Sequence, residues 1–530
     1  MQRPSPPPAR KTRAFAKQKA PLVRKSQARD PRIADEVGTL LRRADRELVL
    51  CYPNSYRVAG SSLGFQVVYR ALNSRPTVAC HRAVLDEQTM AGRGPGVSSL
   101  EFAKPLAHYD AILVSIAYEL DLVHLVHMLR LSGLAPFAAD RPADAPPIIV
   151  GGPLTTSNVL PLGLFADVVV LGDGEQALPH LLDFLEQGLD RQALADAAQD
   201  LPGFWLPARH GDAVPAGLSA SDSDLPALGQ WHSPQAEFAN MMLVETMRGC
   251  PRFCQFCVVR APVAPVRDPT LARVLEVLDL PSFAAAPRVG FVGAAVSDWP
   301  GIKPALAAAI DRGKQIGISS LRADRLNEDD EFVDLLFRGG YRTMTVASDA
   351  PSQRMRGKMM KGLRERHLVG AAEQARRVGM RLFKMYVIVG LPQETDEDLD
   401  ELCDLGQRLS TRISTAIGIS PFVPKLHTPL AQAPFESVEA TGGRLQRIQR
   451  AMGGRVQVRT DSPRQAWVEY RLSMGGIESG HAVLYAADHG GTFKAWGEAF
   501  AALDARDPGE ERAAVTAAQR HGLWSITGNR

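Results

Sequence analysis

The chain has 530 residues, of which 45% are hydrophobic and 22% are charged, a composition typical of a folded globular protein of roughly three or four domains. Its formal net charge of +3 is too close to neutral to indicate nucleic acid or an anionic membrane as its partner. No segment resembles a signal peptide or a membrane-spanning helix, and Cys51, Cys80 and Cys403 stand singly in apolar surroundings, as core residues do. We therefore expect a cytoplasmic protein without a disulfide framework.

The start of the chain is basic and rich in proline. Its first 32 residues contain ten Lys or Arg and one acid. This pattern predicts a disordered tail over residues 1–45. A solvated tail is favoured over an arm that binds nucleic acid.

Residues 46–200 alternate short apolar runs with helical runs. Continuous apolar strands separated by helices indicate a parallel sheet covered on both faces, so we expect a Rossmann-like doubly wound α/β domain. The loops after three of the strands, at 52–56, 151–153 and 172–175, are rich in small and polar residues and are candidate ligand loops. Tight turns without a ligand are the alternative. Strands are predicted at 47–52, 110–117, 147–150 and 166–171, and helices at 63–72, 123–131 and 176–185.

Residues 201–240 contain many prolines and a Ser/Asp run, and we expect a linker there. A second βα series over residues 241–435 predicts a partial (βα)6 barrel of the TIM type, with its chemistry at the carboxyl ends of the strands. Residues 436–530 are expected to form a small helical accessory region. The strands are predicted at 242–246, 289–292, 316–321, 343–347, 382–389 and 415–419.

Three cysteines follow the first strand of this series. Cys250, Cys254 and Cys257 have the spacing C-x3-C-x2-C. Thiolates this close together select zinc or an iron–sulfur cluster. A structural zinc site needs four protein ligands and no fourth is evident nearby, whereas three thiolates leave one iron of a 4Fe-4S cluster open to another ligand. The sequence therefore favours a catalytic iron–sulfur cluster over zinc and over three buried core cysteines.

This spacing, with Phe256 just before the third cysteine, resembles the radical S-adenosylmethionine (radical SAM) superfamily. The resemblance implies a 4Fe-4S cluster on the three cysteines, S-adenosylmethionine as cofactor, and a one-electron reductant such as flavodoxin or ferredoxin as partner. The substrate is unknown, and no catalytic acid or base is assigned.

The resemblance also implies positions that contact S-adenosylmethionine at the later strand ends. Gly293 and Ala294 match the turn that meets the amino group, and Ser320 and Arg322 suit its carboxylate. For Arg322, an ion pair with Asp324 or Asp298 is the alternative. Two further positions are expected on the ribose and adenine sides, namely Asp349, where the family usually has glutamate, and Gly390. Thr395 and Asp398 are interpreted as a helix cap.

A narrower resemblance rests on Tyr52–Asn54, the Gly-rich loops and Phe422–Lys425. These runs are similar to radical SAM proteins with a cobalamin-binding-like N-terminal domain. The usual D-x-H-x-x-G motif is missing, because residues 54–60 read Asn-Ser-Tyr-Arg-Val-Ala-Gly. Any cobalamin is thus expected to bind without a histidine lower ligand, and His124 and His127 are not assigned as ligands.

Three functions follow from these patterns. The leading hypothesis is reductive cleavage of S-adenosylmethionine to a 5′-deoxyadenosyl radical that acts on an unknown substrate. The alternatives are a cobalamin-dependent radical SAM methyltransferase and a non-catalytic iron–sulfur sensor or scaffold.

Overall fold

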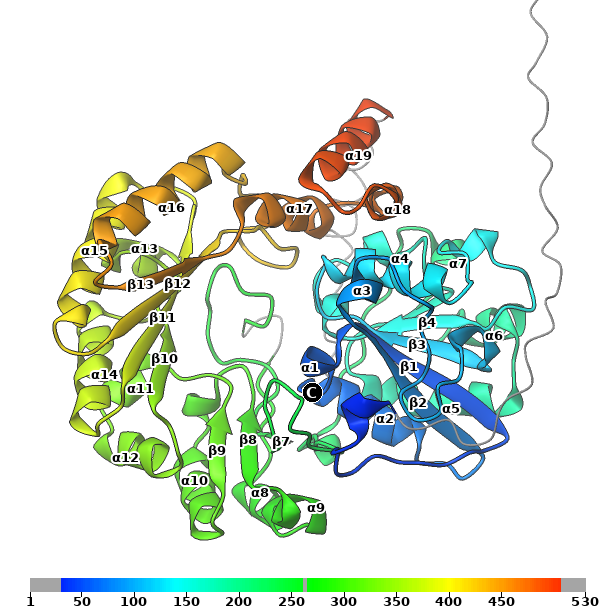
Figure 1. The fold of residues 1–530 in the computed structure, drawn as a ribbon, viewed down its shortest axis with the longest axis horizontal. Helices are drawn as coiled ribbons and strands as arrows, with labels where there is room; N and C mark the ends of the chain where they lie inside the picture. The colour runs from blue at the N-terminus through cyan, green and yellow to red at the C-terminus, as the bar shows by residue number, and fades with distance from the viewer. Residues whose placement is uncertain (1–29, 261–264, 507–530) are drawn as a thin grey trace, which may run out of the picture.

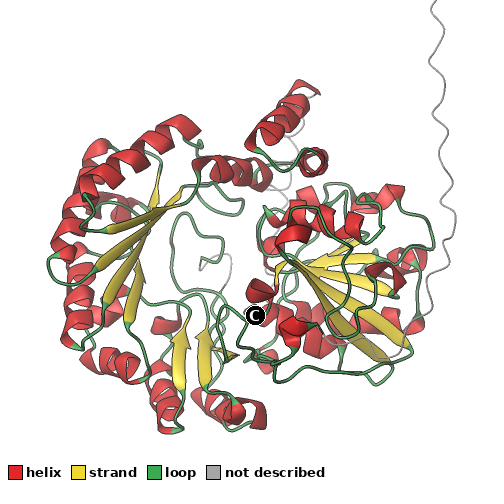
Figure 2. Cartoon of the chain, in the orientation of Figure 1, coloured by secondary structure: helices red, strands yellow, loops and turns green. Residues whose placement is uncertain are grey.

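The computed structural model describes residues 30–260 and 265–506; residues 1–29, most of the expected basic tail, lie outside the described residues. The chain forms two α/β units, an N-terminal sheet between two helical layers and a curved sheet with helices on its outer side (Figure 1). Among the described residues, loops and no strands run through the space between the two sheets (Figure 2). The prediction of a Rossmann-like domain followed by a partial barrel is confirmed.

The N-terminal sheet has the order β2-β1-β3-β4-β5-β6. Its first five strands are parallel, and β6 runs antiparallel to β5. The helices α2, α5 and α6 share a core with one face, while α4 packs on the other, as expected for strands that are apolar throughout. The strands are β1 (Arg46–Ser55), β2 (Val78–Leu85), β3 (Ala111–Ser115), β4 (Ile148–Gly151), β5 (Val168–Val170) and β6 (Phe204–Trp205). The helices are α1 (Tyr56–Ala59), α2 (Leu63–Leu72), α3 (Glu87–Met90), α4 (Asp121–Leu131), α5 (Gly174–Gln187), α6 (Arg191–Ala198) and α7 (Pro207–His210).

The described part of the expected tail is ordered, which corrects the prediction for residues 30–45. Ile33 is fully buried, and Glu36 accepts hydrogen bonds of 2.6 and 2.9 Å from the guanidinium of Arg82. The other side of Arg82 is bonded to Glu101 at 2.7 Å, and all three side chains are inaccessible to solvent. A buried arginine needs carboxylate partners, and this need ties the segment to the domain.

The expected linker also carries structure. Trp205 lies in β6 and pairs with Val169 of β5. Trp231 is buried, with its ring 5.3 Å from Tyr69 and 6.0 Å from Phe65, both on α2. These aromatic contacts hold much of residues 201–240 against the N-terminal domain.

The barrel consists of two parallel sheets, ordered β7-β8-β9 and β10-β11-β12-β13, that form one arc without closing (Figure 1). The region expected to be purely accessory supplies its last strand, β13. The strands are β7 (Met241–Glu245), β8 (Arg288–Val292), β9 (Gln315–Ile318), β10 (Thr343–Ala347), β11 (Leu382–Val389), β12 (Thr415–Pro421) and β13 (Gln457–Thr460). The helices are α8 (Leu271–Leu278), α9 (Pro281–Ala285), α10 (Ile302–Asp311), α11 (Ala323–Asn327), α12 (Asp330–Arg338), α13 (Gln353–Lys358), α14 (Glu365–Arg377), α15 (Asp396–Ser410) and α16 (Val438–Met452).

Three further helices cross from the barrel to the N-terminal domain: α17 (Pro463–Ser473), α18 (Ser479–Asp488) and α19 (Phe493–Arg506). Val483 and Phe500 are buried in the same core as Val114 of β3 and Leu125 of α4. The C-terminal region is therefore helical, as expected, and it bridges the two units. Within the described residues, the helices are too short or too polar to cross a bilayer.

Candidate functional site

The cysteine loop, residues 248–257, follows β7 at the carboxyl end of the barrel strands. Cys250 and Cys254 are 8% exposed, Cys257 is partly exposed, and all three are free thiols. Two contacts fix the loop across the barrel mouth. The guanidinium of Arg252 donates to both carboxylate oxygens of Asp298, at 2.8 and 2.6 Å, and the backbone N–H of Gln255 donates to the carbonyl of Met359 at 3.0 Å.

The three thiols share one electrostatic environment. Burial raises the pKa of the Cys254 thiol, while the charge of Lys361 lowers it and that of Asp349 raises it. The pKa of Cys257 is raised to about 11, chiefly by burial, and the charges of Cys254 and Cys250 contribute to this rise. Thiolates at this site thus need a positive partner, and a bound metal would supply it while releasing protons.

The donor set fits a cluster held by three thiolates, because soft ligands of one kind are presented by one short loop. In the described ranges, no three His, Cys, Asp or Glu side chains are already arranged around a common metal position. The side chains therefore supply the chemistry for a cluster without defining its geometry.

Arg248, directly before Gly249 and Cys250, joins the cysteine loop to the N-terminal domain. Its guanidinium donates to Glu245 at 2.8 Å and to Glu175 at 2.9 Å, and lies 3.4 Å from Asp173. We call these four side chains the Arg248 clasp. The loop at 172–175, expected as a candidate ligand loop, thus uses its acids as anchors for the cysteine loop, which residue spacing could not show.

Phe256 packs against a small buried cluster at the ends of the last barrel strands. The cluster contains Ala350, Met355, Leu391 and Phe422. The aromatic ring therefore fixes the third cysteine of the loop against the opposite side of the barrel mouth, as an apolar anchor.

The turn after β8 is closely packed under the cysteine loop. A Cβ atom on Gly293 would lie 2.9 Å from the carbonyl oxygen of Met247, so this position requires glycine. Ser320 accepts a hydrogen bond from the N–H of Val296 at 2.8 Å and donates to the carbonyl of Gly293 at 3.2 Å. Gly293, Ala294 and Ser320 are thus brought together, and the Ser320 hydroxyl shapes the turn.

Arg322 is 6% exposed and engaged by protein groups. It donates to both oxygens of Asp324, at 3.1 and 3.0 Å, and to the carbonyl of Lys361 at 3.3 Å; its Nε lies 4.0 Å from Asp298. The ion-pair alternative is therefore realised in this structure. A role toward a cofactor carboxylate stays a prediction.

Asp349 lies in the left-handed region, with φ +54°, directly after β10. Its carboxylate is paired with the ammonium group of Lys361. Because both charges act on the Cys254 thiol, this pair lies beside the cysteine loop. Sequence reasoning missed Lys361, whose only signal was its place in the basic run after α13.

Gly390 ends β11 with φ +86°, a conformation that favours glycine. Its N–H donates to both carboxyl oxygens of Glu394, at 3.1 and 3.2 Å, and the N–H of Leu391 donates at 3.3 Å. The capping box of Thr395 and Asp398 at the start of α15 is confirmed.

Glu394 should make stability depend on pH. Burial outweighs the hydrogen bonds and Arg444 and raises the pKa of this carboxyl from 4.5 to about 7. The folded state then binds the proton more tightly than the unfolded state, so the free energy of unfolding falls by about 2–3 kcal/mol as the pH rises from about 4.5 to 7. Glu394→Gln should thus be more stable than wild type at pH 8 and similar to it at pH 5, in denaturant titrations.

The matched control is Glu439→Gln, an exposed position on the neighbouring helix α16. It should change stability equally at both pH values. An equal effect of Glu394→Gln at pH 5 and pH 8 would contradict the raised pKa.

The N-terminal sheet has a cavity of about 440 Å³ at the carboxyl end of its strands. Leu50 of β1 and Leu113 of β3 line it, and these strands flank the point where the strand order reverses, where ligands of such sheets bind. Arg248 and Val292 from the barrel side complete the lining. The cavity therefore opens beside the cysteine loop.

The end of β1 and helix α1, residues 54–60, offer no imidazole to this site. The Asn54 amide donates to Asp121 at 2.9 Å. The ring nitrogens of His127 lie 2.7 Å from the carbonyl of Met90 and 3.4 Å from that of Ala487. His127 is thus a structural histidine that ties α4 to α18.

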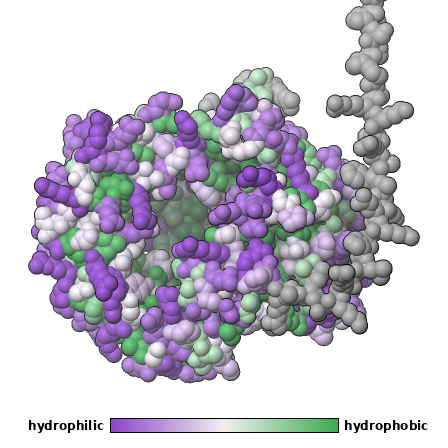
Figure 3. Space-filling view, viewed as in Figure 1, coloured by the Kyte–Doolittle hydropathy of each residue, from purple (hydrophilic) through white to green (hydrophobic). Residues whose placement is uncertain are grey.

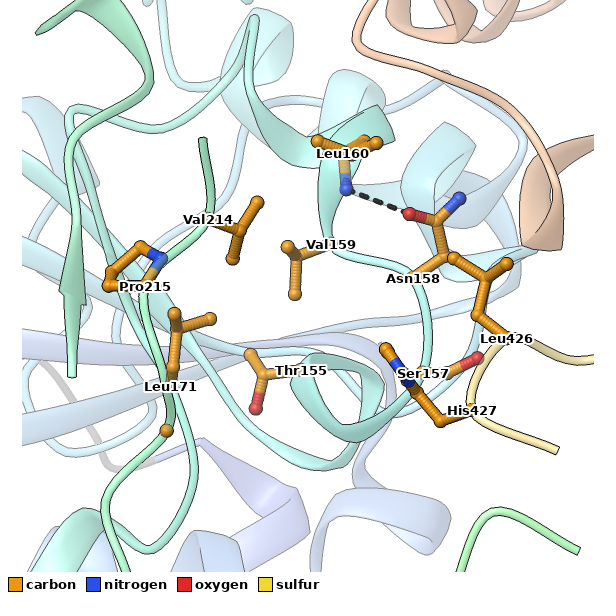
Figure 4. Close-up of a pocket in the computed structure, with 11 residues that line it drawn as sticks. Thr155, Ser157, Asn158, Val159, Leu160, Leu171, Val214, Pro215, Leu426 and His427 are labelled. Atoms are coloured by element: carbon orange, nitrogen blue, oxygen red, sulfur yellow. Dashed lines mark hydrogen bonds between the residues drawn. The ribbon is translucent and has the colours of Figure 1, made fainter. Parts of the chain in front are cut away.

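The seam between the two units is tightly packed around the segment that follows β12. Figure 4 shows Leu426 and His427, from the segment after β12, packed against Ser157 and Asn158 around a cavity of only about 10 Å³. Next to it, Lys425 donates to Glu119 at 2.6 Å and lies 2.7 Å from Glu469 of α17. The cavity in this part of the seam is too small for a substrate, and the contacts around it join the two units.

Comparisons with known proteins match both units. The sequence family of the N-terminal part of radical SAM proteins matches residues 64–207. The sequence family of the radical SAM superfamily matches residues 244–406. Uncharacterized protein MJ0966 of Methanocaldococcus jannaschii is 27% identical over 405 residues, which are 74% of this chain and 80% of that protein.

Two solved structures align with part of the chain. The cobalamin-dependent S-adenosylmethionine radical enzyme OxsB with aqua-cobalamin bound aligns at 15% identity with a TM-score of 0.48, over 70% of this chain and 53% of that chain. Streptococcus suis SuiB bound to S-adenosylmethionine aligns at 14% identity with a TM-score of 0.31, over 44% and 53%. The chain thus spans about half the length of these structures.

The chain belongs to the radical SAM superfamily, since family domains match both its N-terminal unit and its barrel. By these domains it is a radical SAM enzyme. The resemblance seen in the cysteine spacing is confirmed.

Proposed function

We propose that Cys250, Cys254 and Cys257 hold a 4Fe-4S cluster and that the enzyme uses it to generate a radical from S-adenosylmethionine. A cluster held by these thiolates would supply one electron, taken from a reductant such as flavodoxin or ferredoxin, for the cleavage of S-adenosylmethionine to methionine and a 5′-deoxyadenosyl radical. That radical would take a hydrogen atom from the substrate. The observation that carries the proposal is the position of the three thiols, on one anchored loop at the carboxyl end of the first barrel strand.

The surrounding residues support the proposal by fixing the loop. Arg252 and Phe256 hold the cysteine loop at two points of the barrel mouth. Gly293, Ala294 and Ser320 form a compact turn suited to the amino group of S-adenosylmethionine. We assign its carboxylate to the cations beside Cys254, namely Arg322 and Lys361, and its nucleoside to the Asp349 and Gly390 loops.

The cluster assignment is tested by metal and sulfide analysis after anaerobic reconstitution. Because three thiolates hold three of the four irons, we expect about four irons and four sulfides per chain. Replacing the three cysteines together by alanine should abolish iron binding, whereas Cys403→Ala, a buried free cysteine of α15, should retain it. Stoichiometric zinc in place of iron would rule the assignment out.

A second candidate function is methyl transfer that depends on cobalamin. The supporting observation is the largely apolar cavity of about 440 Å³ between β1, β3, α2 and α5, which opens beside the cysteine loop. Since residues 54–60 contain no histidine, cobalamin bound there should show no nitrogen hyperfine splitting from histidine in the electron paramagnetic resonance spectrum of its cobalt(II) state. Failure to bind cobalamin would eliminate this candidate and leave the first untouched.

The family matches support an enzyme over the sensor or scaffold without turnover that the sequence had left as an alternative, and one assay tests that alternative directly. A sensor would bind the cluster and leave S-adenosylmethionine intact. Formation of 5′-deoxyadenosine therefore excludes it.

A further inference from the structure

The inner face of the barrel sheet carries polar side chains that no helix covers. Along β11, Phe383, Met385 and Val387 are buried, while Lys384 and Tyr386 alternate with them and stay accessible. Residues two apart on a strand share a face, so Lys384 and Tyr386 point away from the outer helices. The space-filling view shows a hollow with apolar walls between the two units (Figure 3).

The strand register places three residues of neighbouring strands in one row across this face. Tyr386 of β11 pairs with Gly418 of β12, which pairs with Arg459 of β13. A Cβ on Gly418 would lie 2.8 Å from the Tyr386 ring, so the glycine lets the ring lie flat on the sheet. A cavity of about 280 Å³, lined by Lys384, Tyr386 and Arg459 among others, lies over this row.

A larger cavity adjoins the first. It measures about 920 Å³ and lies between the barrel, α17 and the N-terminal domain. Ser420 and Asp461 line both cavities, so the two adjoin at these residues, and we call them together the lumen chamber. Ile388, on the same face as Tyr386, packs against the cluster that also receives Phe256. The chamber thus lies on the side of the sheet that faces the cysteine loop.

The acids of the lumen chamber are engaged by protein groups. Asp461 accepts a hydrogen bond from Ser420 at 2.6 Å, and Glu469 is paired with Lys425 and bonded to the hydroxyl of Tyr118. Asp121 accepts from the Asn54 amide at 2.9 Å. These carboxylates are therefore already neutralised or hydrogen-bonded.

The cations of the chamber are not engaged in this way. Of the residues that the structure describes, no carboxylate oxygen lies within 4.0 Å of the charged groups of Lys384, Arg459, Arg464 or Arg93. Lys384 donates to the Tyr386 hydroxyl at 2.6 Å, and Arg464 lies over the Phe493 ring at 5.4 Å. The acids of this cavity have hydrogen-bond or ion-pair partners, whereas these cations have no carboxylate partner among the described residues. Such a cavity attracts anions.

We propose that the lumen chamber is the substrate site and that it takes a small molecule with a carboxylate or phosphate group, which Lys384 and Arg459 bind. The inference rests on the proposed radical chemistry for its role and on the chamber alone for its ligand class. Its size suits a small molecule, and guanidinium groups match both kinds of anion.

The test is calorimetric binding of two probes, pyrophosphate and citrate, to the full chain without iron at low ionic strength. We expect the wild type to bind at least one of them, and the one bound more tightly identifies the substrate group. The double variant Lys384→Gln/Arg459→Gln should weaken that binding by about tenfold to a hundredfold, because charge-assisted hydrogen bonds are lost.

The matched control is Arg455→Gln, which removes the same charge from an exposed arginine just before β13 that lines neither cavity. It should bind the probe like the wild type, and the thermal unfolding midpoints of all variants should agree. Absence of binding by the wild type, or an equal loss in Arg455→Gln, would overturn the proposal. Because the assay measures binding without iron, its outcome is independent of whether S-adenosylmethionine is cleaved.

Discussion

Arg248→Met is expected to lower the free energy of unfolding by about 3 kcal/mol, because it leaves the partly buried carboxylates of Glu245 and Glu175 beside an apolar side chain, while Asp173 keeps its ion pair with Arg267. The guanidinium is only 17% exposed, and its hydrogen bonds to Glu245 and Glu175 hold its pKa well above the usual range. Denaturant titration measures the loss. Since Arg248 precedes Cys250 by two residues, iron retention after reconstitution should fall as well.

The control for this variant is Arg312→Met, which breaks an ion pair with Asp279 on the solvent-exposed side of α10. Exposed pairs contribute little, so its unfolding midpoint should stay at the wild-type value. If Arg248→Met were as stable as Arg312→Met, the Arg248 clasp would not be what holds the cysteine loop to the N-terminal domain.

Arg82→Leu should lower the free energy of unfolding by a similar amount, through buried charges in the N-terminal domain. Arg82, Glu36 and Glu101 are wholly buried, so removal of the cation leaves two carboxylates without a partner and costs about 3–5 kcal/mol. Limited proteolysis should then cut near residue 36, because Glu36 ties the first described segment to β2.

Neutralising the two acids separates the effect of unpaired buried charge from the effect of lost packing. The triple variant Arg82→Leu/Glu36→Gln/Glu101→Gln carries no buried charge and should recover part of the lost stability. A triple variant less stable than Arg82→Leu alone would show that packing, not unpaired charge, causes the loss.

The strands and helices that the sequence predicted well have local signals. The apolar runs at 343–347 and 382–389 correspond to β10 and β11, and α2 and α8 begin after the capping residues Ser62 and Thr270. β2 was missed because His81 and Arg82 interrupt its apolar pattern, although every residue of that strand is buried. Their burial depends on partners distant in the sequence, such as Glu36, which periodicity cannot reveal.

In the candidate site, too, features with a local sequence signal were predicted, whereas contacts between distant residues were missed. Cysteine spacing alone singled out the proposed metal-binding loop, and the folded chain brings Gly293, Ala294 and Ser320 into one turn. Arg248 and Lys361 escaped notice because their partners Glu175 and Asp349 come from other elements, and Arg322 proved to be bonded to Asp324. Side-chain pairing across a fold is set by tertiary packing, so the sequence predicted the location of the chemistry better than the partners of each charge.

The most direct measurement of the central proposal is the formation of 5′-deoxyadenosine by the anaerobically reconstituted full chain, given S-adenosylmethionine and a one-electron reductant. The wild type should release 5′-deoxyadenosine and methionine, and the variant in which Cys250, Cys254 and Cys257 are all alanine should release neither. Intact S-adenosylmethionine after incubation with the reduced, iron-loaded wild type would contradict the proposal.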